Sequence, residues 1–95
     1  MIDNKEIINK LFEKTLDKDI EWLVGKTTCF TKIEITNKKF ITYKIGTSYY
    51  LGRYEKVLTI KLSSDRYSFT LLILYANRYR KIYDLEVLVR EFYTP

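Results

Sequence analysis

The sequence predicts a single α+β domain over residues 1–95, in which an N-terminal helix, a four-stranded antiparallel meander and a short C-terminal helix form two layers. Apolar residues recur at helical spacing near the N-terminus, the apolar period changes to two from about residue 26 onward, and helical spacing returns after residue 84. The connections between the expected strands are short, which favours antiparallel neighbours. A chain of 95 residues is long enough for one thin hydrophobic core.

The first element is a helix over about residues 4–17. Asp3 is a favourable N-cap residue, and Glu6 follows three positions later, as in a capping box. Residues 20–24 have no clear helical phase, and we expect them to pin the helix to the sheet through Trp22. The apolar face of the helix has the spacing of one helical stripe. It contains Ile7, Ile8, Leu11, Phe12 and Leu16.

Four strands are expected next, because apolar and polar residues alternate. They cover about residues 29–36, 40–45, 57–62 and 67–75. Residues 46–48 are expected to break or bulge the second strand, and residues 49–51 are a candidate continuation of it.

The second half of the fourth strand, Leu71–Tyr75, is apolar on both faces. A strand in a two-layer fold exposes one face, so this segment needs a second cover. A second helix, residues 49–51 and another subunit are the three candidates.

The C-terminal part is expected to contain a loop or strand extension over residues 76–83 and a helix over about residues 85–92. Asp84 is a plausible N-cap for this helix. The apolar residues that follow have the spacing of one helical face, although the same residues would also suit an edge strand. They are Leu85, Leu88, Val89 and Phe92.

The arrangement of these segments resembles small domains of unassigned function in bacterial and phage genomes. The resemblance covers nearly the whole chain and rests on two short N-terminal motifs, the meander and the closing helix. The motif residues are Leu11–Thr15, Ile20–Trp22, Leu85 and Leu88–Arg90. The resemblance implies no reaction and no functional residues, and it favours a small accessory binding protein.

The chain carries little of the chemistry that catalysis requires. It has no histidine, so the commonest general base and metal ligand is missing. Its one cysteine, Cys29, lies in an expected strand and is expected to be a buried, inert thiol. The three glycines are scattered and form no phosphate-binding fingerprint. We therefore expect a non-enzymatic protein with no catalytic residues, no metal site and no cofactor.

Charge is distributed unevenly along the chain. The net charge is +5; residues 3–23 carry four lysines and six acidic residues, whereas residues 24–95 carry thirteen basic and six acidic residues. A basic region of this kind suits a polyanionic partner, general solubility or contact with the acidic helix.

Two segments combine tyrosines with basic residues, and these side chains recur in binding surfaces. They supply the candidate residues for partner or nucleic-acid binding. These are Tyr49, Tyr50, Arg53 and Tyr54 in the first segment, and Tyr75, Arg78, Tyr79, Arg80, Lys81 and Tyr83 in the second.

These features predict a small binding protein, an inhibitor or regulator encoded by a phage or another mobile element, that docks on a protein partner through a Tyr- and Arg-rich surface. The alternative is an RNA- or DNA-binding protein that uses the basic aromatic loop at residues 75–83. The apolar strand Leu71–Tyr75 is a candidate homodimer face.

The expected location is the cytoplasm of a bacterium or of the host cell of a phage. The N-terminus has no basic region followed by an apolar stretch, and the longest apolar run, Leu71–Ala76, has the length of a strand. Membrane binding is not expected, because the clearest helix is acidic.

Overall fold

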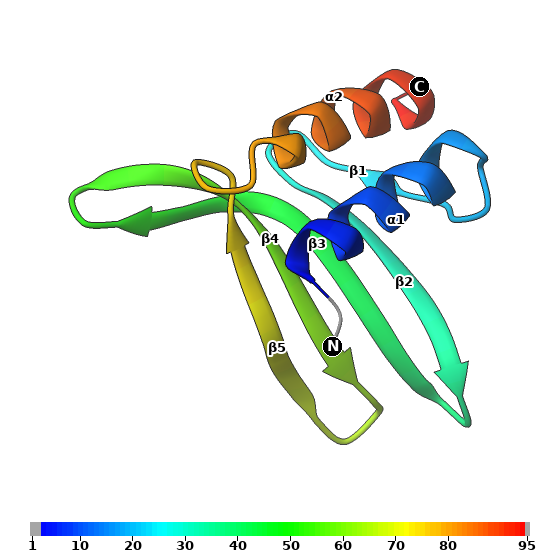
Figure 1. The fold of residues 1–95 in the computed structure, drawn as a ribbon. Helices are drawn as coiled ribbons and strands as arrows, with labels where there is room; N and C mark the ends of the chain where they lie inside the picture. The colour runs from blue at the N-terminus through cyan, green and yellow to red at the C-terminus, as the bar shows by residue number, and fades with distance from the viewer. Residues whose placement is uncertain (1–2, 95) are drawn as a thin grey trace.

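Two helices cover one face of a five-stranded antiparallel sheet in the computed structural model, which describes residues 3–94 (Figure 1). The strands follow one another in the order β1-β2-β3-β4-β5, which is a simple meander. The α+β class, the terminal helices and the antiparallel meander are therefore confirmed. The elements are α1 (Asn4–Leu16), β1 (Leu23–Val24), β2 (Cys29–Thr36), β3 (Lys39–Tyr50), β4 (Arg53–Ser63), β5 (Ser68–Tyr75) and α2 (Lys81–Tyr93).

The N-terminal helix is capped and anchored as the sequence predicts. The Asp3 carboxylate accepts a hydrogen bond from the backbone N–H of Lys5 at 3.2 Å. At the other end, the Trp22 indole N–H donates to the Thr15 hydroxyl at 2.9 Å, and that hydroxyl donates to the Leu11 carbonyl at 2.7 Å. Both side chains are buried, so this short chain of hydrogen bonds fixes the segment that follows α1.

The predicted strand count was wrong, because the exit segment also joins the sheet. Leu23 and Val24 form β1 and pair with Phe30 and Cys29 at the edge of β2. The sheet therefore has five strands rather than four.

The predicted break or bulge at residues 46–48 was also wrong, whereas the predicted continuation of the strand over residues 49–51 is confirmed as far as Tyr50. Gly46 lies opposite Val57 in an unbroken ladder between β3 and β4, and β3 continues to Tyr50. The pairing with β4 supplies hydrogen-bond partners on one side of residues 47–50, so the glycine does not end the strand.

The C-terminal segment is a helix rather than an edge strand, and it begins before residue 85. Its N-cap is Arg80 instead of Asp84, with no side-chain capping hydrogen bond. The Tyr75 carbonyl accepts from the backbone N–H groups of Arg78 and Tyr79, and this turn leads directly into the helix. Ile82 is fully buried and extends the apolar stripe by one turn toward the N-terminus.

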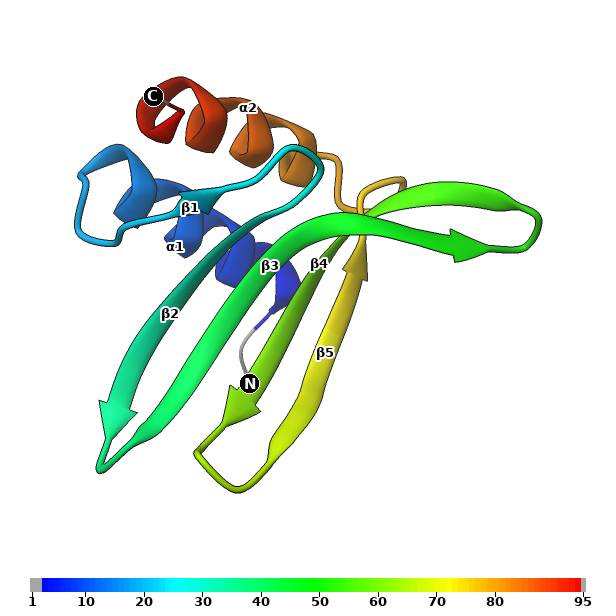
Figure 2. The ribbon, with the colours of Figure 1, turned by 180° about the vertical axis from the view of Figure 1, so that it is seen from behind.

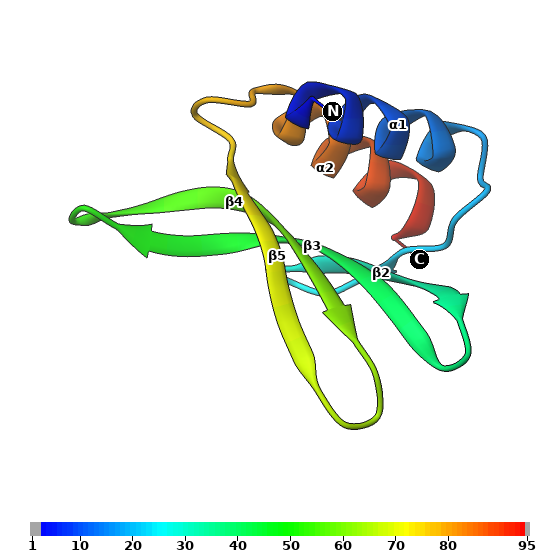
Figure 3. The ribbon, with the colours of Figure 1, turned by 60° about the horizontal axis from the view of Figure 1, so that its bottom comes forward.

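The core lies between the two helices and the part of the sheet near them. Figure 3 shows both helices on the same side of the sheet, while Figure 2 shows the opposite face, on which no helix lies. The largest fully buried side chains come from both layers, and they include Ile8, Ile45, Leu58, Ile82, Leu85 and Val89.

Strands β3 and β4 extend beyond their neighbours as a two-stranded arm. Residues 47–50 pair only with residues 53–56, and the arm projects from the body in Figure 1. Leu51 and Gly52 form the connecting turn with φ values of 50° and 81°. Two consecutive positive φ values are typical of the tight hairpin turn that matches strand twist. We call residues 47–56 the arm.

None of the helices in residues 3–94 is long and apolar enough to cross a membrane.

Candidate functional site

The arm carries the most exposed large side chains near its turn. Tyr49 is 65% exposed, Leu51 83% and Tyr54 76%. Tyr49 and Tyr54 lie opposite each other in the ladder, and their rings make an edge-to-face contact with a centroid distance of 5.1 Å. This contact holds two of the exposed rings in one arrangement before any partner binds.

The second Tyr- and Arg-rich segment folds back against the base of the arm. The Tyr75 ring lies 5.5 Å from the Tyr50 ring, measured between centroids. The Glu55 carboxylate accepts a hydrogen bond from the backbone N–H of Asn77 at 3.2 Å. The structure therefore brings together two segments that are separate in the sequence.

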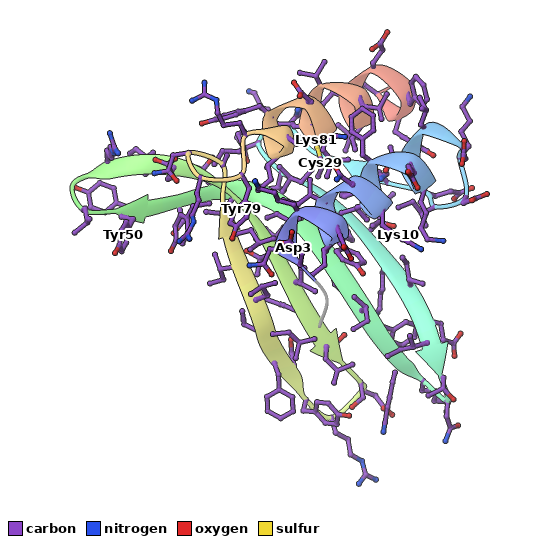
Figure 4. The ribbon with its side chains drawn as sticks, viewed as in Figure 1. Asp3, Lys10, Cys29, Tyr50, Tyr79 and Lys81 are labelled. Carbon is purple, nitrogen blue, oxygen red and sulfur yellow. The ribbon has the colours of Figure 1, made fainter. Side chains whose placement is uncertain are left out.

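A cleft of about 430 Å³ lies where these segments meet. We call it the arm cleft. Figure 4 shows Tyr50 on the arm and Tyr79 beside the start of α2. Five of the predicted site residues line the arm cleft, namely Tyr50, Arg53, Tyr75, Arg78 and Tyr79. The other five, Tyr49, Tyr54, Arg80, Lys81 and Tyr83, do not.

The arm cleft has a positive charge balance. Glu55 is its one acidic lining residue, and its side chain is only 10% exposed. The Glu55 carboxylate lies 3.9 Å from the Arg53 guanidinium, which is itself 73% exposed. Arg78 lies over the Tyr79 ring at 5.9 Å and forms no ion pair within residues 3–94. An anionic group of a partner would therefore meet an uncompensated arginine here.

Two predicted residues of the second segment also make contacts with α1. The Lys81 ammonium lies 4.7 Å from the centre of the Phe12 ring, so it covers part of α1. The Tyr79 hydroxyl accepts a hydrogen bond from the Asn4 side-chain amide at 3.1 Å, and its ring packs against the core. One of the three cations of this segment, Lys81, is therefore in contact with α1, although its side chain remains exposed.

The base of the arm is tied to α2 by an ion pair. The Lys56 ammonium lies 2.9 Å from the Glu86 carboxylate, and Arg90 lies 3.5 Å from the same group. All three side chains are largely shielded from solvent, so the pair fixes where the arm leaves the sheet.

The outer edge of β5 borders the arm cleft; the sequence marked Leu71–Tyr75 as a candidate homodimer face but did not indicate that it adjoins the arm. Leu72, Ile73 and Leu74 contribute to the cleft lining. Leu72 and Leu74 lie opposite the buried residues Ile60 and Leu58, so they face the helices. Leu71 and Ile73 are 54% and 45% exposed. Within the described part of the chain, no second element covers them. The doubly apolar sequence and the place of residues 67–75 at the end of the predicted meander were the two signals for this exposed edge.

A larger groove, of about 590 Å³, lies between α1 and strands β2 and β3. Its floor includes Leu11, Ile33 and Tyr43, and burial raises the pKa of Tyr43 above its ordinary value of 10.0. Its rim alternates acidic and basic residues of α1, among them Glu6 and Lys10, of which Lys10 is labelled in Figure 4. This mixed rim favours no ligand charge, so the groove is a weaker candidate than the arm cleft.

The cysteine has the environment that the sequence predicts. Cys29 is fully buried, and burial raises the pKa of its thiol above the ordinary value of 9.0. A raised pKa keeps the thiol protonated and poorly nucleophilic. Residues 3–94 contain no group of three or more His, Cys, Asp or Glu side chains that would suit a metal ion.

The chain matches no protein-family model, no curated protein and no solved structure in comparisons of all three kinds.

Proposed function

We propose that this protein is a non-enzymatic binding protein that docks on a protein partner through its arm and the adjoining cleft, and so inhibits or regulates that partner. The observation that carries the proposal is the cluster of large exposed side chains on the projecting arm. Leu51, the most exposed of them, lies at the turn itself.

The composition of the arm supports a protein partner. Binding energy in protein interfaces concentrates in tyrosine, tryptophan and arginine side chains that become fully desolvated. The arm and cleft present Tyr49, Tyr50, Tyr54 and Arg53 in one region. Side chains held by ladder pairing and ring contacts lose little conformational entropy on binding, which favours affinity.

The anchoring of the arm supports the same proposal. The Lys56–Glu86 ion pair and the hydrogen bond from Asn77 to Glu55 hold the base of the arm against α2 and the following loop. A projecting element that is rigid at its base suits insertion into a partner surface.

The nucleic-acid alternative has less support from the contacts. The three basic residues of the loop segment, Arg78, Arg80 and Lys81, are all exposed, and Lys81 lies over the Phe12 ring of α1. The exposed rings lie mainly on the arm, where Arg53 is the cation beside them. The two most exposed rings, Tyr49 and Tyr54, lie outside the cleft that contains Arg78, so they do not form one continuous stacking surface with the cations of the loop.

The test is site-specific photo-crosslinking in the cells that naturally produce the protein. A photoreactive phenylalanine analogue replaces Leu51 at the arm turn, and in a matched control it replaces Asp65, an exposed residue in the β4–β5 turn. We expect position 51 to crosslink to one defined protein and position 65 not to do so.

A variant with Tyr49→Ser, Leu51→Ser and Tyr54→Ser completes the test. We expect it to lose the partner while keeping its urea unfolding midpoint nearly unchanged, because these side chains are outside the core. Equal crosslinking from both positions, or crosslinking to nucleic acid alone, contradicts the proposal.

A further inference from the structure

We propose that the partner supplies an extended segment that adds as a sixth strand to the free edge of β5, with an acidic residue of that segment seated in the arm cleft. This inference rests on the proposed function and specifies the mode of binding and the chemistry of the partner segment. Strand addition to an exposed sheet edge is a common mode of peptide recognition.

The backbone of β5 presents hydrogen-bonding groups along this edge. β5 is the last strand of the sheet, and Figures 1 and 2 show no strand along its outer edge, with the arm projecting past its C-terminal end. The backbone N–H of Ala76 donates to the Lys56 carbonyl of β4 at 2.9 Å. Since successive residues of a strand alternate in direction, Leu74 also points its backbone groups toward β4, while Ile73 and Tyr75 point theirs outward.

The following loop sets one end of this edge. The Tyr75 carbonyl already accepts hydrogen bonds from the backbone N–H groups of Arg78 and Tyr79, at 3.1 and 2.9 Å. Ile73 is therefore the last residue whose N–H and C=O both point outward without such a contact. The arm cleft lies at this end, so a strand paired with Ile73 would lead directly into it.

The β5 edge also lacks the features that normally block strand addition. Exposed edges in natural proteins are protected by charged residues, proline or covering elements. All eight residues of Ser68–Tyr75 are uncharged, and none is proline. The opposite edge differs, because β1 pairs with the start of β2, and Lys32 and Glu34 lie further along that strand.

A bulge limits the usable length of the edge. Ile60 pairs with Leu72 and Lys61 pairs with Thr70, which leaves Leu71 as an extra residue on β5. Such a bulge bends the strand and disturbs regular pairing. The segment available for a partner strand is therefore about residues 71–75, next to the arm cleft.

The side chains around this edge define the partner segment. Exposed Leu71 and Ile73 would lie beside alternate residues of an added strand, which should therefore be apolar or β-branched. At the cleft end, Arg78 has no acidic partner among residues 3–94. Arg53 lies 3.9 Å from Glu55, whose carboxylate also accepts the hydrogen bond from Asn77. An acidic residue suits this position. In an antiparallel addition, it precedes the apolar residues in the partner sequence.

The experiment begins with the purified full chain and a random peptide library displayed on phage. We expect enriched peptides to contain an acidic residue followed by alternating apolar residues. Charge reversal by Arg78→Glu should weaken a selected peptide about tenfold or more, as expected for loss of a charge-assisted contact.

Backbone pairing is tested by Ile73→Pro, which removes the outward N–H while leaving the bonds to β4 in place. The matched control is Lys32→Pro on the opposite edge. The Thr28 carbonyl accepts a hydrogen bond from the Gly25 N–H, so the backbone groups of Thr28 point away from β3. Since residues alternate along the strand, the backbone groups of Lys32 also point outward. We expect the first variant to lose the peptide and the second to bind it normally.

Residue-resolved hydrogen exchange of the unmodified chain gives a readout that does not depend on how variants fold. The amide of Ile73 should exchange rapidly in the free protein and become protected when the peptide binds. The amide of Leu74 should be protected in both states. Enrichment of peptides without the acidic and apolar pattern, or binding that leaves Ile73 unprotected, overturns the inference.

The outcomes separate this inference from the function on which it rests. If position 51 crosslinks to a protein while Ile73 stays unprotected in that complex, the protein-binding function stands and strand addition is wrong. If no protein crosslinks at position 51, the proposed function itself fails. Self-association of the chain through β5 in sedimentation experiments would assign the edge to a second copy and also overturn the inference.

Discussion

At the residue scale, Thr15 joins helix α1 to the segment that follows it. Its hydroxyl is fully buried, accepts from the Trp22 indole N–H and donates to the Leu11 carbonyl. Both bonds lie away from water, so removing the hydroxyl would leave a buried donor on the indole without a partner. Loss of such a buried hydroxyl costs more free energy than the hydrogen bond itself, because the remaining donor stays buried without an acceptor.

We expect Thr15→Ala to lower the free energy of unfolding by about 1–3 kcal/mol, the usual cost of an unsatisfied buried donor. Urea unfolding followed by Trp22 fluorescence measures the change. Thr27→Ala, in an exposed position, is the control and should change stability by less than about 0.5 kcal/mol. Equal effects of the two substitutions would contradict this role of Thr15.

Two weakly acidic groups, the buried Cys29 thiol and the half-buried Tyr43 hydroxyl, predict how stability depends on pH. Burial raises the pKa of Cys29 above 9.0 and that of Tyr43 above 10.0, so the folded state binds more protons than the unfolded state in alkaline solution. Stability from these groups is complete below their ordinary pKa values and is lost as the pH rises through the folded values.

The urea midpoint should therefore fall between about pH 8 and pH 11. Tyr43→Phe should make this fall smaller, because phenylalanine has no group to ionise. Measurement of both proteins at matched ionic strength tests this point. An identical alkaline loss in the variant and the parent would show that Tyr43 does not contribute.

At the element scale, the arm turn combines conformational strain with exposure. Leu51 adopts a φ of 50°, a conformation that suits asparagine or glycine better than leucine. It is also the most exposed large apolar residue described. An unfavourable residue at an exposed turn is readily explained if its side chain contacts a partner.

Leu51→Asn should raise the free energy of unfolding by about 0.5–1 kcal/mol, because Asn-Gly is the favoured pair in this hairpin turn. The same substitution should weaken partner capture. Thermal unfolding and a pull-down with the identified partner measure the two effects. Improved stability with unchanged capture would remove Leu51 from the interface.

The sequence predicts elements best where the pattern is local. The cap at Asp3, the anchor at Trp22 and the alternation of the long strands follow from neighbouring residues, and the structure agrees. The continuation of β3 through Gly46 depends instead on its pairing with β4, which is a tertiary effect. The earlier start of α2 depends on burial of Ile82 in the core.

The candidate site was predicted in pieces but not as a whole. Tyr50 and Tyr75 were both predicted because they lie in segments rich in tyrosine and basic residues. Their contact with each other arises from the path of the meander. The contact of Lys81 with Phe12 also joins distant parts of the chain. No periodicity in the sequence reports contacts of this kind, which explains why five predicted residues lie outside the cleft.

At the scale of the whole molecule, the net charge of +5 produces a weak attraction to any polyanion. This attraction needs no dedicated site. It is screened by salt, since it acts between exposed charges.

Binding to mixed-sequence single-stranded DNA and RNA should therefore be measurable at low salt and lost at about 0.15 M salt, where the Debye length is short. A titration by fluorescence anisotropy at both salt concentrations tests this expectation. A variant with Arg78→Ser, Arg80→Ser and Lys81→Ser separates the loop from the general field. Salt-resistant binding that this variant loses would support the nucleic-acid alternative.

The central claim is that the arm is the surface through which this protein binds another protein. The most direct measurement is the crosslinking yield from position 51 compared with that from position 65, in cells that produce the protein naturally. The account predicts one defined protein adduct at position 51, lost when Tyr49 and Tyr54 are changed to serine. Equal yields at the two positions, or no protein adduct at position 51, would contradict it.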